Sequence, residues 1–176
     1  MKLNLKLLIP AIIIAIVLIG TSYILLSKQN EETENNTTAQ TSSNVESENA
    51  NYKASFAIYT NGTFRIFTAP MYHNLSADVF IEASNPNIVN VKKSNISWRG
   101  FFKTLPFELD ENCLTTGTKQ TFCTNENDVL QFYLNEDRNQ SALDQIINPG
   151  DKLLVTYDKE NSSAIAQQLQ SIPSSE

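Results

Sequence analysis

The sequence contains a single histidine, His73, among its 176 residues. This scarcity argues against chemistry that depends on imidazole groups, such as a histidine base beside a nucleophile or several histidines around a metal ion. No Ser/His/Asp arrangement and no histidine placed next to a nucleophile is evident in the sequence. We therefore expect a non-catalytic protein without a cofactor, unless the cysteines carry out chemistry.

Basic side chains are also few in the larger part of the chain. Residues 29–176 carry 19 acidic and 10 basic side chains, a formal net charge of −9. Proteins that bind nucleic acid neutralise its phosphates with clustered lysine and arginine. A nucleic-acid partner is therefore not expected, and the acidic surface is interpreted as a solvated exterior.

Charge is absent from Leu7 to Leu26, a run of about 20 residues that reads LLIPAIIIAIVLIGTSYILL. A helix of that length rises about 30 Å, the thickness of the hydrocarbon core of a bilayer. Lys2 and Lys6 precede the run and favour a cytoplasmic N-terminus, although Lys28 directly after it is a counter-signal. The alternative is a cleaved signal peptide, which normally has a shorter apolar region and a small-residue cleavage site. The sequence predicts a single-pass anchor in the cell membrane, with the N-terminus inside and the rest of the chain outside.

The segment after the anchor has almost no apolar side chains and reads SKQNEETENNTTAQTSSNVESENAN. Such a composition cannot bury enough apolar surface to offset the entropy cost of ordering, so it predicts a disordered stalk. The sequence thus divides into a cytoplasmic N-terminus (1–6), an anchor (7–26), a stalk (27–51), an extracytoplasmic domain (52–158) and a polar tail (159–176).

Alternating apolar residues predict several strands in the domain. Residues 55–67 read as a hairpin around Asn61-Gly62, a type I′ turn that would pair Tyr59 with Phe64 and Ala57 with Ile66. Further strands are expected at 78–83, 88–91, 129–134 and 152–157, with turns at 85–87 and 148–151.

Apolar residues spaced i, i+3, i+4 and i+7 predict one short helix between the strands. Ser94 or Ser97 is the expected cap and Pro106 the expected end. The stripe that this helix should bury is Trp98, Phe101, Phe102 and Leu105. A helical turn capped by Ser141 should bury Leu143, Ile146 and Ile147, and the tail should form at most a single turn at 164–169.

This order of strands, helix and strands predicts an α+β domain of about 107 residues, enough for one hydrophobic core. A β-grasp-like mixed sheet with one short helix packed across it fits the order best. A small β-sandwich is the alternative.

The two cysteines lie in the run NCLTTGTKQTFC, at Cys113 and Cys123. A hairpin centred on Thr118 sets these cysteines opposite each other, and it matches Leu114 with Phe122 and Thr115 with Thr121. Gly117 is expected to supply the positive φ of the turn. Opposed cysteines reach disulfide distance, and an extracytoplasmic location allows the bond to persist.

A structural disulfide is favoured over two alternatives that stay open. Thiol–disulfide exchange usually relies on a CxxC pair or on a cation beside the sulfur, whereas nine residues separate Cys113 from Cys123. Zinc expects four ligands, and the two sulfurs have no histidines near them. If the chain is an enzyme, these two cysteines are its expected catalytic residues.

Other polar groups give weaker indications of a site. Met71 and His73 are candidate copper ligands, although two ligands do not make a site. Residues 110–112 and 125–128 offer oxygen ligands for calcium without EF-hand spacing, and each reads more simply as a solvated turn. Acceptor sequences for N-linked glycosylation occur at Asn35, Asn36, Asn61, Asn74, Asn95, Asn139 and Asn161.

Several segments resemble a family of small membrane-anchored proteins of ammonia-oxidising archaea. They are residues 56–62, 98–105, 130–135 and 149–157, together with the two cysteines, so that the likeness covers most of residues 52–158. Members of the family carry a His-x-His segment just before the helix. The corresponding stretch here, residues 91–94, reads VKKS, which implies that a metal site of that kind is absent. Some members are labelled protein-disulfide isomerases, and this chain has no CxxC motif.

Together these features predict a membrane-anchored extracytoplasmic binding or interaction module, held to the bilayer through Leu7–Leu26. Its partner would be an extracytoplasmic protein or a small ligand that the sequence does not name. A thiol–disulfide oxidoreductase or isomerase is the alternative, and a metal-handling accessory protein is a weaker one.

Overall fold

The computed structural model describes residues 49–159 and 162–175. The predicted anchor and residues 27–48 of the predicted stalk lie outside these ranges, as do Asn35, Asn36 and Asn161. Within the described ranges, no helix has the length and apolar character needed to cross a membrane.

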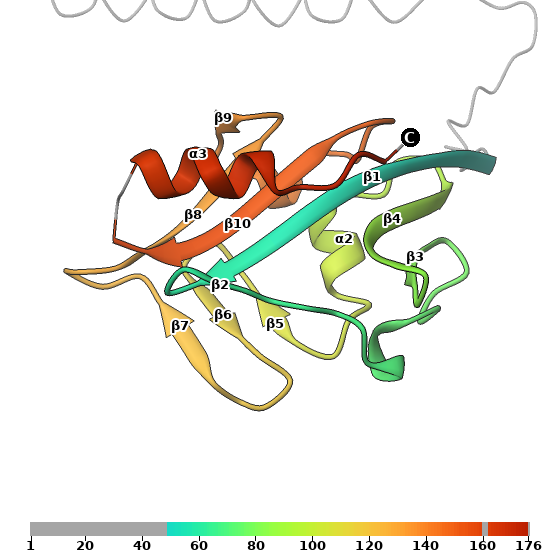
Figure 1. Cartoon of the computed structure of the whole chain (residues 1–176). Coiled ribbons are helices and arrows are strands. Elements are labelled where there is room, and N and C mark those ends of the chain that lie inside the picture. The colour runs from blue at the N-terminus through green and yellow to red at the C-terminus, as the bar shows by residue number, and fades with distance from the viewer. Residues whose placement is uncertain (1–48, 160–161, 176) are drawn as a thin grey trace, which may run out of the picture. The chain divides into compact units, whose positions relative to one another are not determined.

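A seven-stranded mixed sheet forms the centre of the fold (Figure 1). Its strands are β1 (Asn49–Thr60), β2 (Thr63–Phe64), β3 (Val79–Glu82), β4 (Asn85–Lys93), β8 (Val129–Leu134), β9 (Asp137–Arg138) and β10 (Lys152–Asp158). They lie in the order β3-β4-β1-β10-β8-β9, with β2 also paired to β1. The first and last long strands, β1 and β10, are parallel neighbours, and the remaining pairs are antiparallel. This is the predicted α+β, β-grasp-like arrangement rather than a β-sandwich.

The remaining elements cover the two faces of this sheet. They are the strands β5 (Glu108–Leu109), β6 (Cys113–Thr115) and β7 (Thr121–Cys123), which form a small sheet, the helices α2 (Trp98–Phe102) and α3 (Ser162–Gln170), and the 3₁₀ turns η1 (Pro70–Tyr72) and η2 (Ala142–Asp144). Figure 1 shows α3 along one face of the large sheet, and α2 with the small sheet on the other.

Alternation along β1 divides its side chains between two cores. Phe56 and Ile58 are buried in the larger core, together with α2 and the small sheet, whereas Ala57 and Tyr59 belong to a smaller core beneath α3. Because successive side chains of a strand point to opposite faces, one strand contributes to both layers.

The predicted helix is present, and its start and end have simple causes. The Ser97 hydroxyl accepts a hydrogen bond from the Gly100 amide at 3.1 Å, the expected N-cap contact. The α-helix ends at Phe102, and the amides of Thr104 and Leu105 then donate to the carbonyls three residues earlier, a tighter turn. Pro106 follows, and a proline disfavours the helical conformation at the residue before it. The four residues of the predicted stripe are all buried.

The hairpin predicted over residues 55–67 is shorter than expected. Asn61 and Gly62 both have positive φ, as a type I′ turn requires, and Tyr59 pairs with Phe64. The expected pairing of Ala57 with Ile66 does not form, and Ile66 is 66% exposed. A strand has only two edges: β10 lies along one edge of β1, and β4 occupies much of the other, which leaves β2 only the end of the strand.

The turn expected at residues 85–87 lies two residues earlier. Glu82 pairs with Asn85, so Ala83 and Ser84 make the turn and Pro86 lies within β4. Proline is tolerated there because pairing of β4 with β1 begins only at Ile88, so no amide hydrogen is needed from Pro86 on that side.

Two predictions near the end of the domain were also incomplete. Leu143 and Ile147 are buried as expected, but Ile146 is 41% exposed and the Ser141 side chain makes no cap. The cause is that Gln145 is already extended, so that Ile146 and Ile147 point to opposite sides. The tail, expected to hold a single turn, forms the nine-residue helix α3, whose Ile165 is buried against the sheet.

Candidate functional site

The two cysteines are joined in a disulfide across the hairpin of β6 and β7. Cys113 pairs with Cys123 in the register expected from the sequence, and the hydroxyls of Thr115 and Thr121 lie 3.1 Å apart in a hydrogen bond. Leu114 and Phe122, the apolar pair between them, are buried in the larger core. The hairpin is therefore fixed both by the covalent bond and by its buried face.

The surroundings of this disulfide lack one feature that is common in reactive cysteine pairs. The cysteines lie on strands, so neither benefits from the helix N-terminus that lowers the pKa of a reactive thiol. No cysteine is left as a free thiol. The hairpin thus holds one wall of the site described next.

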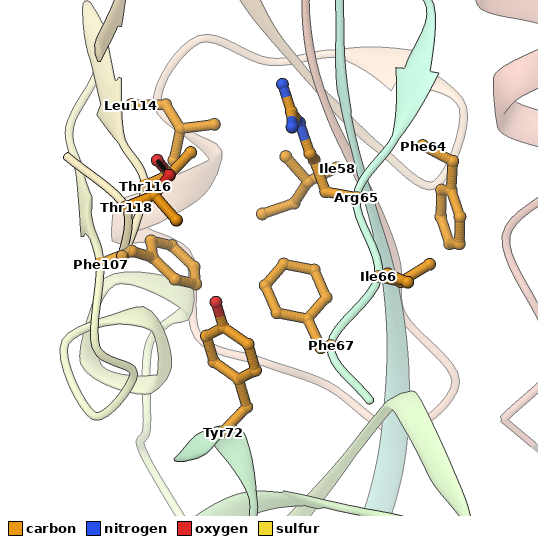
Figure 2. A pocket seen from close by; sticks show the side chains of 11 residues that line it. Ile58, Phe64, Arg65, Ile66, Phe67, Tyr72, Phe107, Leu114, Thr116 and Thr118 are labelled. Carbon is orange, nitrogen blue, oxygen red and sulfur yellow. Dashed lines mark hydrogen bonds between the residues drawn. The ribbon is translucent and has the colours of Figure 1, made fainter. Parts of the chain in front are cut away.

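A cavity of about 220 Å³ lies between this hairpin and the segment that follows β2 (Figure 2). Figure 2 shows Phe67, Phe107 and Tyr72 turned toward one another across it, with Leu114 and the hairpin threonines on one side. We call this cavity the Arg65 pocket, and its lining residues are Ile58, Phe64, Arg65, Ile66, Phe67, Tyr72, Phe107, Leu114, Thr116, Gly117 and Thr118.

Arg65 is the cationic residue of the pocket lining. Its Nε donates a hydrogen bond to the Thr60 hydroxyl, and its guanidinium carbon lies 5.2 Å from the centre of the Phe122 ring. These contacts hold the side chain along the pocket wall, because a guanidinium over an aromatic face is attracted by the ring quadrupole. Among the described residues, no carboxylate forms an ion pair with Arg65.

The Tyr72 hydroxyl is a second polar group in the pocket. The Tyr72 ring packs edge-on against Phe67, with centroids 5.2 Å apart. A β-carbon added at Gly117 would lie 3.5 Å from this hydroxyl and 3.2 Å from the Pro106 carbonyl oxygen. The hairpin tip therefore approaches Tyr72 closely because residue 117 lacks a side chain.

The predicted reason for a glycine at position 117 was wrong. Lys119, not Gly117, takes the positive φ of the turn, at 66°. The absence of a side chain at Gly117 serves the contact between hairpin and pocket rather than the turn geometry.

Several large apolar side chains are exposed beside the pocket. Phe64, Ile66 and Met71 are each at least 36% exposed, and the first two belong to the pocket lining. The Met71 methyl group would lie 3.7 Å from a β-carbon at Gly117, which places it close to the hairpin tip. Exposed apolar groups beside a cavity are typical of binding sites.

The candidate copper ligands lie at the edge of this region. The His73 Nε2 lies 2.8 Å from the Phe67 carbonyl oxygen, at hydrogen-bonding distance. One of the two ring nitrogens is therefore engaged with the backbone. Within the described residues, no group of three or more His, Cys, Asp or Glu side chains could hold a metal ion. A copper site at Met71 and His73 stays a prediction.

The two candidate calcium segments form turns. The Asp110 carboxylate accepts hydrogen bonds from the amides of Asn112 and Cys113, both at 2.7 Å. The Asn125 side-chain oxygen accepts from the amides of Asn127 and Asp128 at 2.8 and 3.1 Å. Polar side chains that bond to the backbone two or three residues on are characteristic of such turns.

The glycosylation candidates in the described part of the chain occupy turns or their borders. Asn61, Asn74 and Asn95 are exposed and have positive φ. Asparagine adopts this left-handed conformation more readily than most residues, which gives these positions a structural role without modification. Asn139 is half-buried, and its side chain accepts a hydrogen bond from the Ser141 amide.

Sequence reasoning did not identify the Arg65 pocket. Its lining comes from two separate stretches of the chain, residues 58–72 and residues 107–118. The one local signal is an arginine in a largely apolar hairpin arm, and the sequence alone assigns it no role.

Comparison with known proteins gives no further guidance. No protein-family model, curated protein or solved structure matches this chain.

Proposed function

We propose that this chain is a non-catalytic binding module held at the outer face of a cell membrane, with the Arg65 pocket as its ligand site. The observation that carries the proposal is the combination of an apolar cavity with an arginine that lacks an ion-pair partner among the described residues. Ligand sites are typically cavities with a mainly apolar lining and a few placed polar groups.

Four features support the proposed location. The uncharged run Leu7–Leu26 has the length of a membrane span, and the polar segment after it would hold the domain away from the bilayer. Disulfides persist in oxidising compartments outside the cytoplasm, where the Cys113–Cys123 bond would be stable. The resemblance to membrane-anchored archaeal proteins agrees with this arrangement.

Both walls of the Arg65 pocket are anchored in the fold, which supports the proposal that the cavity binds a ligand. One wall is the disulfide-linked hairpin, and the other is the segment that follows β2 together with Ile58 of β1, a strand at the centre of the large sheet. A cavity between two fixed walls loses little conformational entropy when it takes up a ligand.

The proposal is tested by screening small fluorinated ring compounds against the full chain in lipid nanodiscs. The set contains neutral and charged compounds, and ¹⁹F line broadening reports binding, with empty nanodiscs to correct for lipid partition. We expect at least one compound to bind saturably at millimolar concentration or below.

Two variants locate the binding. Thr118→Trp places a large side chain at the pocket edge and should abolish binding. Ser84→Trp makes the same change in the exposed turn between β3 and β4 and should leave binding intact. If no compound binds, or if Thr118→Trp binds as well as the parent, the Arg65 pocket is not the ligand site.

A further inference from the structure

We infer that the Arg65 pocket takes a ligand with a ring-sized apolar body and a single carboxylate, and that the carboxylate pairs with the Arg65 guanidinium. This inference rests on the proposed function and adds the chemical class of the ligand.

The hydrogen-bonding capacity of Arg65 is largely unused. A guanidinium has five N–H donors, and in this structure Nε donates to the Thr60 hydroxyl. The terminal nitrogens of Arg65 have no hydrogen-bond partner among the described residues, although the guanidinium is held over the Phe122 ring. The planar fork of these nitrogens matches a carboxylate with two parallel hydrogen bonds.

Arg99 provides a direct comparison within the same domain. Its guanidinium pairs with two carboxylates, those of Asp144 and Glu111. Lys93 and Lys119 also have carboxylate partners, at 3.5 and 3.8 Å. Arg65 therefore stands apart in a strongly acidic chain as a half-buried arginine without a carboxylate partner in the described ranges.

The size of the cavity limits the apolar part of the ligand. An apolar cavity of about 150 Å³ holds one benzene ring. The volume of about 220 Å³ thus accommodates one ring and a short arm that carries the acid. Phe67, Phe107 and Leu114 supply the surface against which such a ring would pack.

The charge of the pocket limits the acidic part. Arg65 is the cation among the lining residues, and the rest are apolar side chains, hydroxyls and one glycine. A phosphate group carries a charge of about −1.5 to −2, which one arginine would leave partly uncompensated in this lining. A monoanionic carboxylate is matched by one guanidinium, and the Tyr72 hydroxyl can bond to another polar atom of the ligand.

The experiment uses two pairs of probes against the full chain in nanodiscs. The first pair is 3-(4-fluorophenyl)propanoate and its amide, which have the same shape but differ in charge. The second pair is acetyl-glycyl-(4-fluoro)phenylalanine with a free C-terminus and its C-terminal amide. The first pair represents a small free acid and the second the C-terminus of a peptide, which share the inferred chemistry.

We expect one or both acids to bind at least about tenfold more tightly than the matching amide, since hydrogen bonds to charged groups are the stronger ones. Arg65→Gln should weaken binding of the acid by about 10- to 100-fold and leave the amide unchanged. Arg65→Lys should restore part of the affinity because it keeps the charge. Lys53→Gln, which removes an exposed cation of β1, should have no effect.

The outcomes separate this inference from the proposed function. Equal binding of acid and amide, or unchanged acid binding by Arg65→Gln, overturns the carboxylate assignment while the pocket remains a binding site. Failure of all four probes and of every compound of the screen overturns both. If both acids depend on Arg65, the tighter one identifies the source of the ligand.

Discussion

Arg99 joins three segments that are distant in the sequence. Its side chain extends from α2 to Asp144 in η2, with 2.7 Å between Nε and Oδ1, and to Glu111 in the turn before β6. The hydrogen bond from Arg99 lowers the pKa of the Asp144 carboxyl, and the two carboxylates raise the pKa of Arg99. Individual surface ion pairs stabilise a protein weakly, so the main effect of this network is to position the three segments relative to one another. It holds α2 against the segment that leads into the disulfide hairpin.

Asp144→Asn should lower the melting temperature at pH 7 by more than at pH 2. The pKa of Asp144 in the folded protein lies below its ordinary value of 3.8, so the ion pair contributes fully above that value and is lost as the pH falls through the folded pKa. Thermal unfolding of the full chain in detergent, followed by circular dichroism at both pH values, measures the difference. Glu126→Gln, an exposed turn residue, serves as the control. An equal loss at both pH values would contradict the assigned pair.

The disulfide hairpin is both a cross-link of the fold and a wall of the Arg65 pocket. The bond between Cys113 and Cys123 closes a loop, and the turn beyond it supplies Thr116, Gly117 and Thr118 to the pocket. The position of these three residues therefore depends on an element with only three residues in each strand. Two short strands alone are marginally stable, which makes the covalent bond important for the shape of the pocket.

Replacement of both cysteines by serine should destabilise the folded chain by about 2.7 kcal/mol, the chain-entropy value for a loop of about 11 residues. Denaturant unfolding of the parent and the double variant measures the loss. Ligand binding in the pocket should weaken in the same variant because one wall becomes mobile.

The intact bond should have a reduction potential below roughly −300 mV, as structural disulfides do. A potential near −200 mV with fast thiol exchange would favour the oxidoreductase alternative instead.

The helix α3 covers the face of the sheet opposite the pocket. Ile165 and Ile172 are buried against Ala57, Tyr133 and Leu154, and the Tyr59 hydroxyl lies 2.7 Å from that of Ser171. Without α3, the apolar side chains of this face would be open to water.

Ile165→Ala should destabilise the domain by about 2 kcal/mol, the lower end for truncation of a buried isoleucine, because the smaller core has room to relax. Gln167→Ala is the matched control, since Gln167 is exposed on the same helix and alanine favours the helix. Denaturant unfolding of the two variants is the measurement. A loss in Gln167→Ala as large as in Ile165→Ala would show that α3 does not pack as described.

Charge is distributed unevenly over the whole molecule. All 19 acidic residues follow residue 28, and Lys2 and Lys6 precede the uncharged run of residues 7–26. In the proposed topology, Lys2 and Lys6 lie on the cytoplasmic side, as the positive-inside rule expects, and the acidic domain lies outside the membrane. An acidic domain repels polyanions, which agrees with a ligand of single charge at Arg65.

The full chain, expressed in a bacterial host, should remain in the membrane fraction after alkaline carbonate extraction. Protease added to spheroplasts should degrade the domain, whereas a cytoplasmic marker protein should survive. Replacement of Ile13 and Ile16 by aspartate should release the chain from the membrane, because charged residues at the centre of a span are costly. Recovery of the unaltered chain in the soluble fraction would contradict the anchor.

Much of the fold was predictable because its signals are local. The β6–β7 register follows from residues within one hairpin, and the buried stripe of α2 follows from helical spacing. The Asn61-Gly62 turn was identified because few residues adopt positive φ at both central positions. In each case, the residues that decide the structure are close together in the chain.

The predictions that failed involve competition between distant segments. The length of β2 depends on how β4 occupies the edge of β1, and the role of Gly117 depends on Pro106 and Tyr72. The packing of α3 depends on small and apolar residues of three strands. Local patterns do not contain this information.

The sequence by itself determined the uncharged membrane-length run, the acidic exterior, the class of the domain and the pairing of its two cysteines, since composition and short-range periodicity govern these features. Only the tertiary structure decided that Arg65 lies in an apolar cavity without a carboxylate partner in the described ranges. The residues that line the pocket around Arg65 are up to about 60 positions apart in the chain. They come together only because the large and the small sheet pack against each other.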